Sequence, residues 1–180
     1  MSIRNASTLR NFTQSLNQLE NDIVSLYWSV YSLNISFNDI MTDRFDTEDG
    51  IDKTKSFYSY NILDKSISKP SLGNLILVTK PWEASRNNPT NAYVILEIET
   101  QTQIQLNADV LIQISTDGGI NFFDIKFLSY FKENGFLKYI KGTISGIPRM
   151  NSNLIRTKVI CTPVALLKIR ALATGIKYSI

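Results

Sequence analysis

The sequence predicts an α+β protein in which a long N-terminal α-helix precedes an all-β antiparallel sandwich of jelly-roll type. Apolar residues recur in alternating steps of three and four between residues 9 and 40, short β-rich runs fill the chain from residue 74 onward, and no helical pattern interrupts those runs. We expect an oligomerising helix over residues 1–41, an extended connector over residues 42–72 and the sandwich over residues 73–180.

The N-terminal helix is predicted by a heptad pattern with one narrow apolar seam. No Pro or Gly interrupts residues 9–40, so the helix would be about 48 Å long at a rise of about 1.5 Å per residue. One helix cannot bury such a seam alone, and we expect identical chains to join in a parallel coiled coil over residues 8–41. The seam residues are Leu9, Phe12, Leu16, Leu19, Ile23, Leu26, Val30, Leu33, Phe37 and Ile40.

The number of chains in this coiled coil is less sharply specified. Leu, Ile and Val mix at the a position and Leu dominates the d position, a composition that does not distinguish a dimer from a trimer. The bulky Phe12 and Phe37 favour the wider core of a homotrimer. Two alternatives stay open: the helix packs along the β domain of its own chain, or two shorter helices form an antiparallel hairpin.

The acidic stretch DRFDTEDGID, residues 43–52, follows the heptad pattern directly. We interpret it as the joint between helix and sandwich. Its alternative is a calcium loop, because Asp46, Glu48 and Asp52 could supply oxygen ligands around a turn. The EF-hand spacing is missing, however, since the twelfth residue counted from Asp46 is Phe57 rather than Glu. We therefore predict no metal site and no cofactor.

Eight short runs with strand character are spaced almost regularly along the C-terminal part. The stretch STDGG at residues 115–119 contains an Asp-Gly turn and a second Gly that can take a positive φ, so Ile114 and Phe122 should belong to one hairpin. The eight runs are NLILVTK, AYVILEIE, ADVLIQIS, INFFDIKF, FLKYIKGTIS, LIRTKVIC, ALLKIRALA and GIKYSI.

The charge of the chain is unevenly distributed. Residues 1–52 hold three basic and eight acidic side chains, a net charge of −5, whereas the remaining residues hold 16 basic and 8 acidic side chains, a net charge of +8. The basic residues are spread through strands and loops rather than clustered with aromatics, so we expect no nucleic-acid partner. No apolar run is long enough to span a bilayer, and the N-terminus lacks a secretory signal, so we expect no membrane partner and assembly in the cytoplasm.

The residue types available for chemistry are limited. The chain has no histidine, which removes the usual triads, most zinc sites and the commonest general base. Cys161 is the single cysteine and lies in an apolar run, so we expect it to be buried. A glycosidase could use a carboxylate pair drawn from Glu97, Glu99 and Glu133, but acids spaced in this way are commoner on a solvated strand face. We predict no catalytic residue and a protein that is not an enzyme.

One loop has the composition of a sugar contact. Trp82 could stack on a sugar ring, while Arg86, Asn87 and Asn88 could bind hydroxyl groups. The alternative is that Trp82 plugs the open end of the sandwich.

Three stretches in this order carry a resemblance to a known group of proteins. DRFDTEDGID, the hairpin ISTDGGINF and the final strand GIKYSI together resemble the C-terminal β-sandwich modules of structural proteins from tailed bacteriophages, over roughly residues 43–180. The chain departs from that pattern with Phe122 and Phe123 where such modules often carry Trp or Tyr, and with a long helix in front.

The resemblance implies a virion component assembled in the host cytoplasm. Such a protein would be a tail fibre, a head decoration or an adaptor, and its partners would be copies of itself and other virion proteins. The alternative that it leaves open is a carbohydrate- or receptor-binding module of a host-recognition appendage, which would contact polysaccharide on the host surface.

Overall fold

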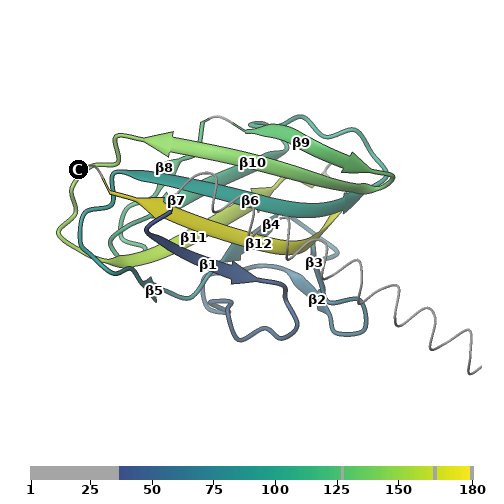
Figure 1. Cartoon of the computed structure of the whole chain (residues 1–180). Helices are drawn as coiled ribbons and strands as arrows, with labels where there is room; N and C mark the ends of the chain where they lie inside the picture. Colours follow the sequence, from purple (N-terminus) through teal and green to yellow (C-terminus); the bar gives the residue numbers. More distant parts are fainter. Residues whose placement is uncertain (1–36, 127, 164–165, 179–180) are drawn as a thin grey trace, which may run out of the picture. The chain divides into compact units, whose positions relative to one another are not determined.

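The computed structural model describes residues 37–126, 128–163 and 166–178 (Figure 1), almost all of them within the compact unit Asn38–Ile180. These residues form antiparallel strands connected by turns and loops. The strands are β1 (Asp39–Asp43), β2 (Ser59–Asn61), β3 (Ser66–Ser68), β4 (Leu75–Val78), β5 (Trp82–Glu83), β6 (Asn91–Thr100), β7 (Val110–Ser115), β8 (Phe123–Asp124), β9 (Ser129–Asn134), β10 (Leu137–Ser145), β11 (Leu154–Cys161) and β12 (Leu167–Lys177).

The larger of the two sheets is organised around β12. Its strand order is β2-β3-β12-β6-β10-β9. On one side β12 pairs with β6 along almost its whole length, and on the other side it pairs first with β3 and then with β1. Two short strands therefore share one edge of a single long strand, and in Figure 1 these strands form one layer of the sandwich.

The smaller sheet repeats this arrangement around β11. Its order is β4-β11-β7-β8, and β5 also pairs with β11, on residues that β4 leaves free. The short strand β8 ends this sheet beside β7, to which it is joined through two residue pairs. Both lateral edges of the smaller sheet are thus formed by short strands.

The hydrophobic core lies between the two sheets and follows the period-two alternation of the strands. In β6, Val94, Leu96 and Ile98 are fully buried, and in β7 the facing residues Ile112 and Ile114 are at most 1% exposed. Burial of side chains of this size stabilises the fold by about 1.5–3 kcal/mol each.

The predicted sandwich is confirmed, and each of the eight predicted runs contains part of a strand. The last two runs merge into the single strand β12, whereas five strands lie outside the predicted runs: β1, β2, β3, β5 and β9. The predicted hairpin is also present, since β7 and β8 flank the turn with Ile114 paired to Phe123, and Gly118 and Gly119 have φ values of 74° and 95°.

The predicted α+β class is wrong for the described residues, which are all-β and contain no helix. Phe37 precedes β1, and Ile40 lies within β1, where its Cα is paired with Gly175 of β12. The free edge of β12 accepts this segment as a strand, so tertiary pairing overrides the helical spacing at the end of the heptad pattern. The other seam residues lie outside the described residues: Leu9, Phe12, Leu16, Leu19, Ile23, Leu26, Val30 and Leu33.

The stretch expected as a connector, residues 42–72, contains the end of β1 and the strands β2 and β3, all of which belong to the larger sheet. Within it, Phe45 and Ile51 are at most 1% exposed and form part of the core. No helix in the described part of the chain is long and apolar enough to cross a membrane.

Candidate functional site

A cavity opens at the lateral edge of the sandwich where β8 of the smaller sheet faces β10 of the larger one. The last residue pair between β10 and β9 is Lys141 with Ser129, so residues 142–145 continue beyond the end of β9. The cavity has a volume of about 420 Å³ and is lined by β8 and its flanking residues Phe122 and Lys126, by this end of β10 and by the loop that follows β10.

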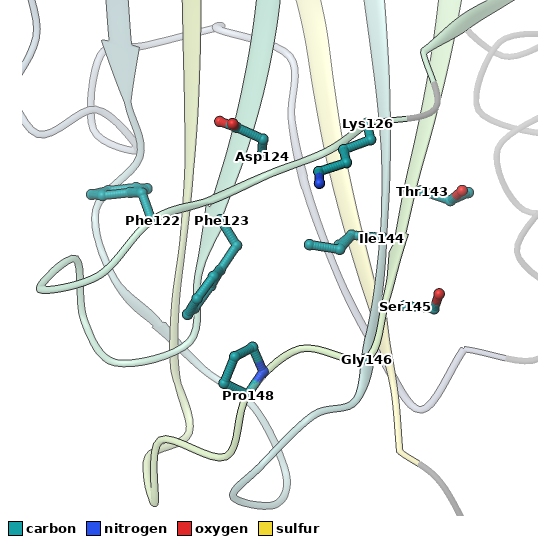
Figure 2. A pocket seen from close by; sticks show the side chains of 9 residues that line it. All are labelled: Phe122, Phe123, Asp124, Lys126, Thr143, Ile144, Ser145, Gly146 and Pro148. Carbon is teal, nitrogen blue, oxygen red and sulfur yellow. The ribbon is translucent and has the colours of Figure 1, made fainter.

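The walls of the cavity are mainly apolar. Figure 2 shows the Phe123 ring and the Ile144 side chain projecting toward the same space from the two strands, with Pro148 beside them. Phe123 and Ile144 are both partly buried and pack against the core, so the cavity floor is continuous with the hydrophobic interior. The side chains of Thr143 and Ser145 point away from this space in the same view.

Two charged residues lie at the rim. Lys126 has its ammonium group directed toward the cavity (Figure 2), and within the described residues it has no hydrogen bond or ion pair. The Asp124 carboxylate accepts a hydrogen bond of 2.8 Å from Nε2 of Gln113 on the neighbouring strand. The site therefore combines an aromatic ring, aliphatic walls and a small number of polar groups, as binding pockets for small molecules commonly do.

The turn before β8 fixes the position of the aromatic wall. The Asp117 carboxylate accepts hydrogen bonds from the backbone N–H groups of Ile120 and Asn121, and Ser115 Oγ accepts one from Gly119. Burial raises the pKa of Asp117, but these bonds and one from Ser115 outweigh it and leave the pKa below its usual value. The Asp117 carboxylate thus holds the turn that leads into β8.

The rest of this lateral edge is covered by the segment between β8 and β9. Ile125 and Leu128 are nearly fully buried there and pack against Gly142 of β10. A Cβ atom at position 142 would lie 2.5 Å from Leu128 Cδ2 and 2.6 Å from Ile125 Cγ2. Gly142 is therefore required for the close approach of this cover to β10.

The sugar-contact residues predicted from the sequence lie elsewhere and do not line this cavity. Trp82 is partly buried in β5 against the core, while Arg86 is exposed with its guanidinium carbon 5.9 Å from the centroid of the Tyr178 ring. The side chain of Asn88 accepts a hydrogen bond of 2.7 Å from the backbone of Asn151, and Asn87 is exposed. Sugar binding by this loop stays a prediction.

Trp82 has one unusual feature. Its indole Nε1 is buried and, among the described residues, has no hydrogen-bond partner. The ring packs against the core beside Ile155, its partner residue in β11. This inward position is the one expected for a residue that plugs the sandwich.

Two of the three glutamates considered for glycoside hydrolysis form ion pairs on the sheet. Glu99 in β6 pairs with Arg170 of β12 and lies 3.8 Å from Lys168. Glu133 in β9 lies 3.7 Å from Lys138 of β10. Both glutamates thus take part in cross-strand ion pairs.

The carboxylates of the acidic stretch turn toward separate partners. Asp46 pairs with Lys65, and Glu48 accepts hydrogen bonds from Lys53 and from the Tyr58 hydroxyl. Asp52 pairs with Arg156 of β11. In the part of the chain that the structure describes, no group of three or more acidic residues or cysteines converges as metal ligands would.

Cys161 is fully buried in β11, as the sequence predicted, and burial raises the pKa of its thiol to about 12. It is therefore a thiol, and not a thiolate, at neutral pH.

Sequence reasoning did not identify the cavity. The sequence marks Phe122 as a residue of the predicted hairpin, and Phe122 and Phe123 as departures from the Trp or Tyr of the phage modules, but neither as part of a binding site. Lys126, Ile144 and Pro148 carried no signal, because their proximity depends on the order of the strands in two sheets and on where β9 ends beside β10.

No family model matches the chain, and no curated protein matches it. Among solved structures, similar ones include a CBM35 from Paenibacillus barcinonensis, with 14% identity over 77% of this chain and 99% of that chain and a TM-score of 0.42. A carbohydrate-binding module of family 29 has 12% identity over 78% of this chain and 91% of that one, with a TM-score of 0.43. The catalytic domain of a GH87 alpha-1,3-glucanase has 12% identity over 79% of this chain and 28% of that chain, with a TM-score of 0.35. We draw no function from these likenesses.

Proposed function

We propose that this protein is a carbohydrate-binding β-sandwich without catalytic activity, and that its sugar site is the cavity between β8 and β10. The volume of about 420 Å³ falls within the range of about 300–1,000 Å³ usual for small-molecule sites. A sugar ring has an apolar C–H face and a polar rim of hydroxyl groups, and the cavity offers both kinds of contact.

The observation that carries this proposal is the position of Phe123. Its backbone is held by pairing with Ile114, and its ring forms a wall of the cavity opposite Ile144. An aromatic ring fixed in this way presents a large apolar surface and loses little conformational entropy when a sugar binds. Lys126 and Asp124 at the rim can then bind hydroxyl groups of the sugar and orient the sugar ring.

Binding without catalysis is proposed because of the acids at the site. Asp124 is the one carboxylate among the described residues that line the cavity, and it is already hydrogen bonded to Gln113. Glycoside hydrolysis generally uses two carboxyl groups on either side of the scissile bond.

The test is a glycan array followed by calorimetric titration of the glycans that bind. Phe123→Ala should weaken binding about tenfold, because it removes the stacking surface. Phe123→Leu retains apolar volume in the core and separates loss of stacking from loss of folding. Phe136→Ala is the matched control, since Phe136 is an exposed aromatic in the turn between β9 and β10. Absence of any bound glycan, or equal losses with Phe123→Ala and Phe136→Ala, would contradict the proposal.

The setting that we propose is the surface of a tailed-bacteriophage particle, in a fibre, decoration or adaptor protein. Its support is the sequence resemblance over residues 43–180, in which the acidic stretch, the β7–β8 hairpin and the final strand occur in the same order. The host partner would be surface polysaccharide, and the other partners would be virion proteins. On this proposal a phage encodes the chain, and mass spectrometry of its purified particles should detect the chain; absence from those particles would contradict the setting.

A further inference from the structure

We infer that the glycan bound at this edge is anionic and that it passes around β8, with contacts on both sides of the strand. This inference rests on the proposed function and specifies the class of ligand. It is carried by two adjacent aromatic residues whose rings point in different directions, by Lys158 beside the Phe122 ring and by Lys126 at the cavity rim.

The two aromatics are Phe122 and Phe123. Successive residues of an extended chain point to opposite faces of a sheet. Both residues line the cavity, but Phe123 packs against the core between the sheets, whereas the Phe122 ring lies near Lys158, a residue of β11. Figure 2 shows the two rings leaving the chain in different directions. A chain of several sugar units that contacts the Phe123 ring in the cavity can therefore continue to the Phe122 ring and to Lys158 beside it.

A positive charge accompanies each aromatic. Lys126 is at the cavity rim, and Lys158 Nζ lies 5.3 Å from the centroid of the Phe122 ring. Within the described residues neither lysine has a carboxylate within ion-pair distance, in contrast to lysines such as Lys53, Lys65 and Lys168. The contact with an aromatic face leaves the other side of the Lys158 ammonium able to bind an anion.

The one acid among the described residues that line the cavity, Asp124, does not cancel both lysine charges. Gln113 of β7 is paired with Asp124 on one side and with Lys158 on the other. The Gln113 amide donates a hydrogen bond to the Asp124 carboxylate. The hydrogen-bond partner of this carboxylate is therefore a neutral amide and not a lysine. Lys126 and Lys158 carry two positive charges and Asp124 carries one negative charge, so this edge has a net positive charge. A positive edge favours sugars that carry carboxylate or sulfate groups.

The experiment is calorimetric titration of the full chain with oligomers of galacturonic acid of increasing length, and with the same oligomers after methyl esterification, which removes the charge. Sulfated carrageenan oligomers and neutral agarose oligomers form a second pair, which separates carboxylate from sulfate recognition. We expect the anionic member of at least one pair to bind about fivefold more tightly than its neutral counterpart, with a preference that falls at high salt.

Variants locate the two contacts. Lys126→Gln should abolish the preference for short anionic oligomers, whereas Phe122→Ala and Lys158→Gln should weaken only the longer ones. Lys80→Gln is the control with the same change of charge, because Lys80 is exposed and lies in the loop between β4 and β5.

The outcomes separate the two proposals. Equal binding of anionic and neutral oligomers, or an equal effect of Lys80→Gln and Lys126→Gln, would overturn the inference and leave the carbohydrate site intact. Failure of every glycan, charged or neutral, to bind would overturn the proposed function itself. A length dependence that Phe122→Ala does not change would overturn the path around β8.

Discussion

Along one lateral edge of the sandwich, beside β4, the chain folds its own residues 44–58 over the gap between the sheets, whereas along the opposite edge, beside β8, it leaves part of that gap uncovered. At the covered edge Phe57 and Ile76 exchange two backbone hydrogen bonds of 2.7 and 2.8 Å. Phe45 and Ile51 from the same segment enter the core. At the edge beside β8, Ile125 and Leu128 cover part of the gap and the cavity occupies the rest.

The difference teaches where stability and binding are located in this molecule. The covered edge is held by full burial and by hydrogen bonds such as that from the Tyr60 hydroxyl to the Phe45 carbonyl, at 2.9 Å. The other edge exposes aromatic and aliphatic surface that a partner can still bury. Substitutions at the covered edge should therefore change the free energy of unfolding most, and those at the cavity should change ligand binding most.

The largest effect is expected from Phe45→Ala. Phe45 is fully buried, and its truncation leaves a cavity that should lower the free energy of unfolding by about 3–5 kcal/mol in urea denaturation. Phe123→Ala is the matched change at the open edge and should cost about half as much, because its ring is only partly buried. Equal losses at the two edges would contradict the distinction between them.

The next effect is expected from Gly142→Ala. The new Cβ would collide with Leu128 and Ile125, so the cover beside the cavity must move, at a cost of about 1–3 kcal/mol by thermal or urea unfolding. Because the collision is with a side chain, the costs of Gly142→Ala and Leu128→Ala should not add in the double variant.

Gly146→Ala is the control for this steric effect. Its φ is 70° and nothing lies within 4 Å of the added Cβ, so the cost is that of the backbone alone, about 1 kcal/mol. That cost should add to the cost of Leu128→Ala. Additivity for Gly142→Ala as well would show that the cover is not packed as described.

Much of the sandwich could be predicted because its strands carry their own signal. Alternation in β7 and β12, and the Asp-Gly turn before β8, depend on residues close together in sequence. The prediction of a helix at the end of the heptad pattern was wrong because the structure there depends on a residue far away in the sequence. Ile40 fits a helical step equally well, and only the free edge of β12, more than 130 residues later, makes it a strand residue.

The candidate site was hidden from the sequence by the same distance. Phe123 and Ile144 meet because β8 is the edge strand of the smaller sheet and residues 142–145 of β10 extend beyond the end of β9, the edge strand of the larger sheet. Strand order of this kind does not follow from propensity or spacing. Trp82 is by residue type the more typical sugar-binding residue, but its pairing with Ile155 of β11 places its ring against the core.

A smaller effect is expected from acid at the covered edge. Hydrogen bonds from Thr54 and Arg156 lower the pKa of Asp52 from 3.8 to about 2. A carboxylate with a lowered pKa stabilises the folded state above its unfolded pKa, so this contribution is complete above about pH 4 and is lost as the pH falls toward 2.

The free energy of unfolding should fall between pH 5 and pH 2.5, and Asp52→Asn should make this fall about 1 kcal/mol smaller than in the wild type. The comparison is internal, because the variant and the wild type should converge in stability as the pH falls. An unchanged difference between them across this range would show that Asp52 acts only through neutral hydrogen bonding.

The smallest effect is expected from the ion pair between Asp46 and Lys65. Both side chains are about 60% exposed, and pairs exposed to this degree contribute about 0.5 kcal/mol or less because water and salt screen them. Lys65→Ala should therefore hardly change the urea midpoint, and added salt should not change the difference measurably. A loss above about 1 kcal/mol would mean that charge pairing, rather than the burial of Phe45 and Ile51, holds this edge closed. In that case stability at the covered edge would depend on ionic strength, as binding at the open edge is expected to do.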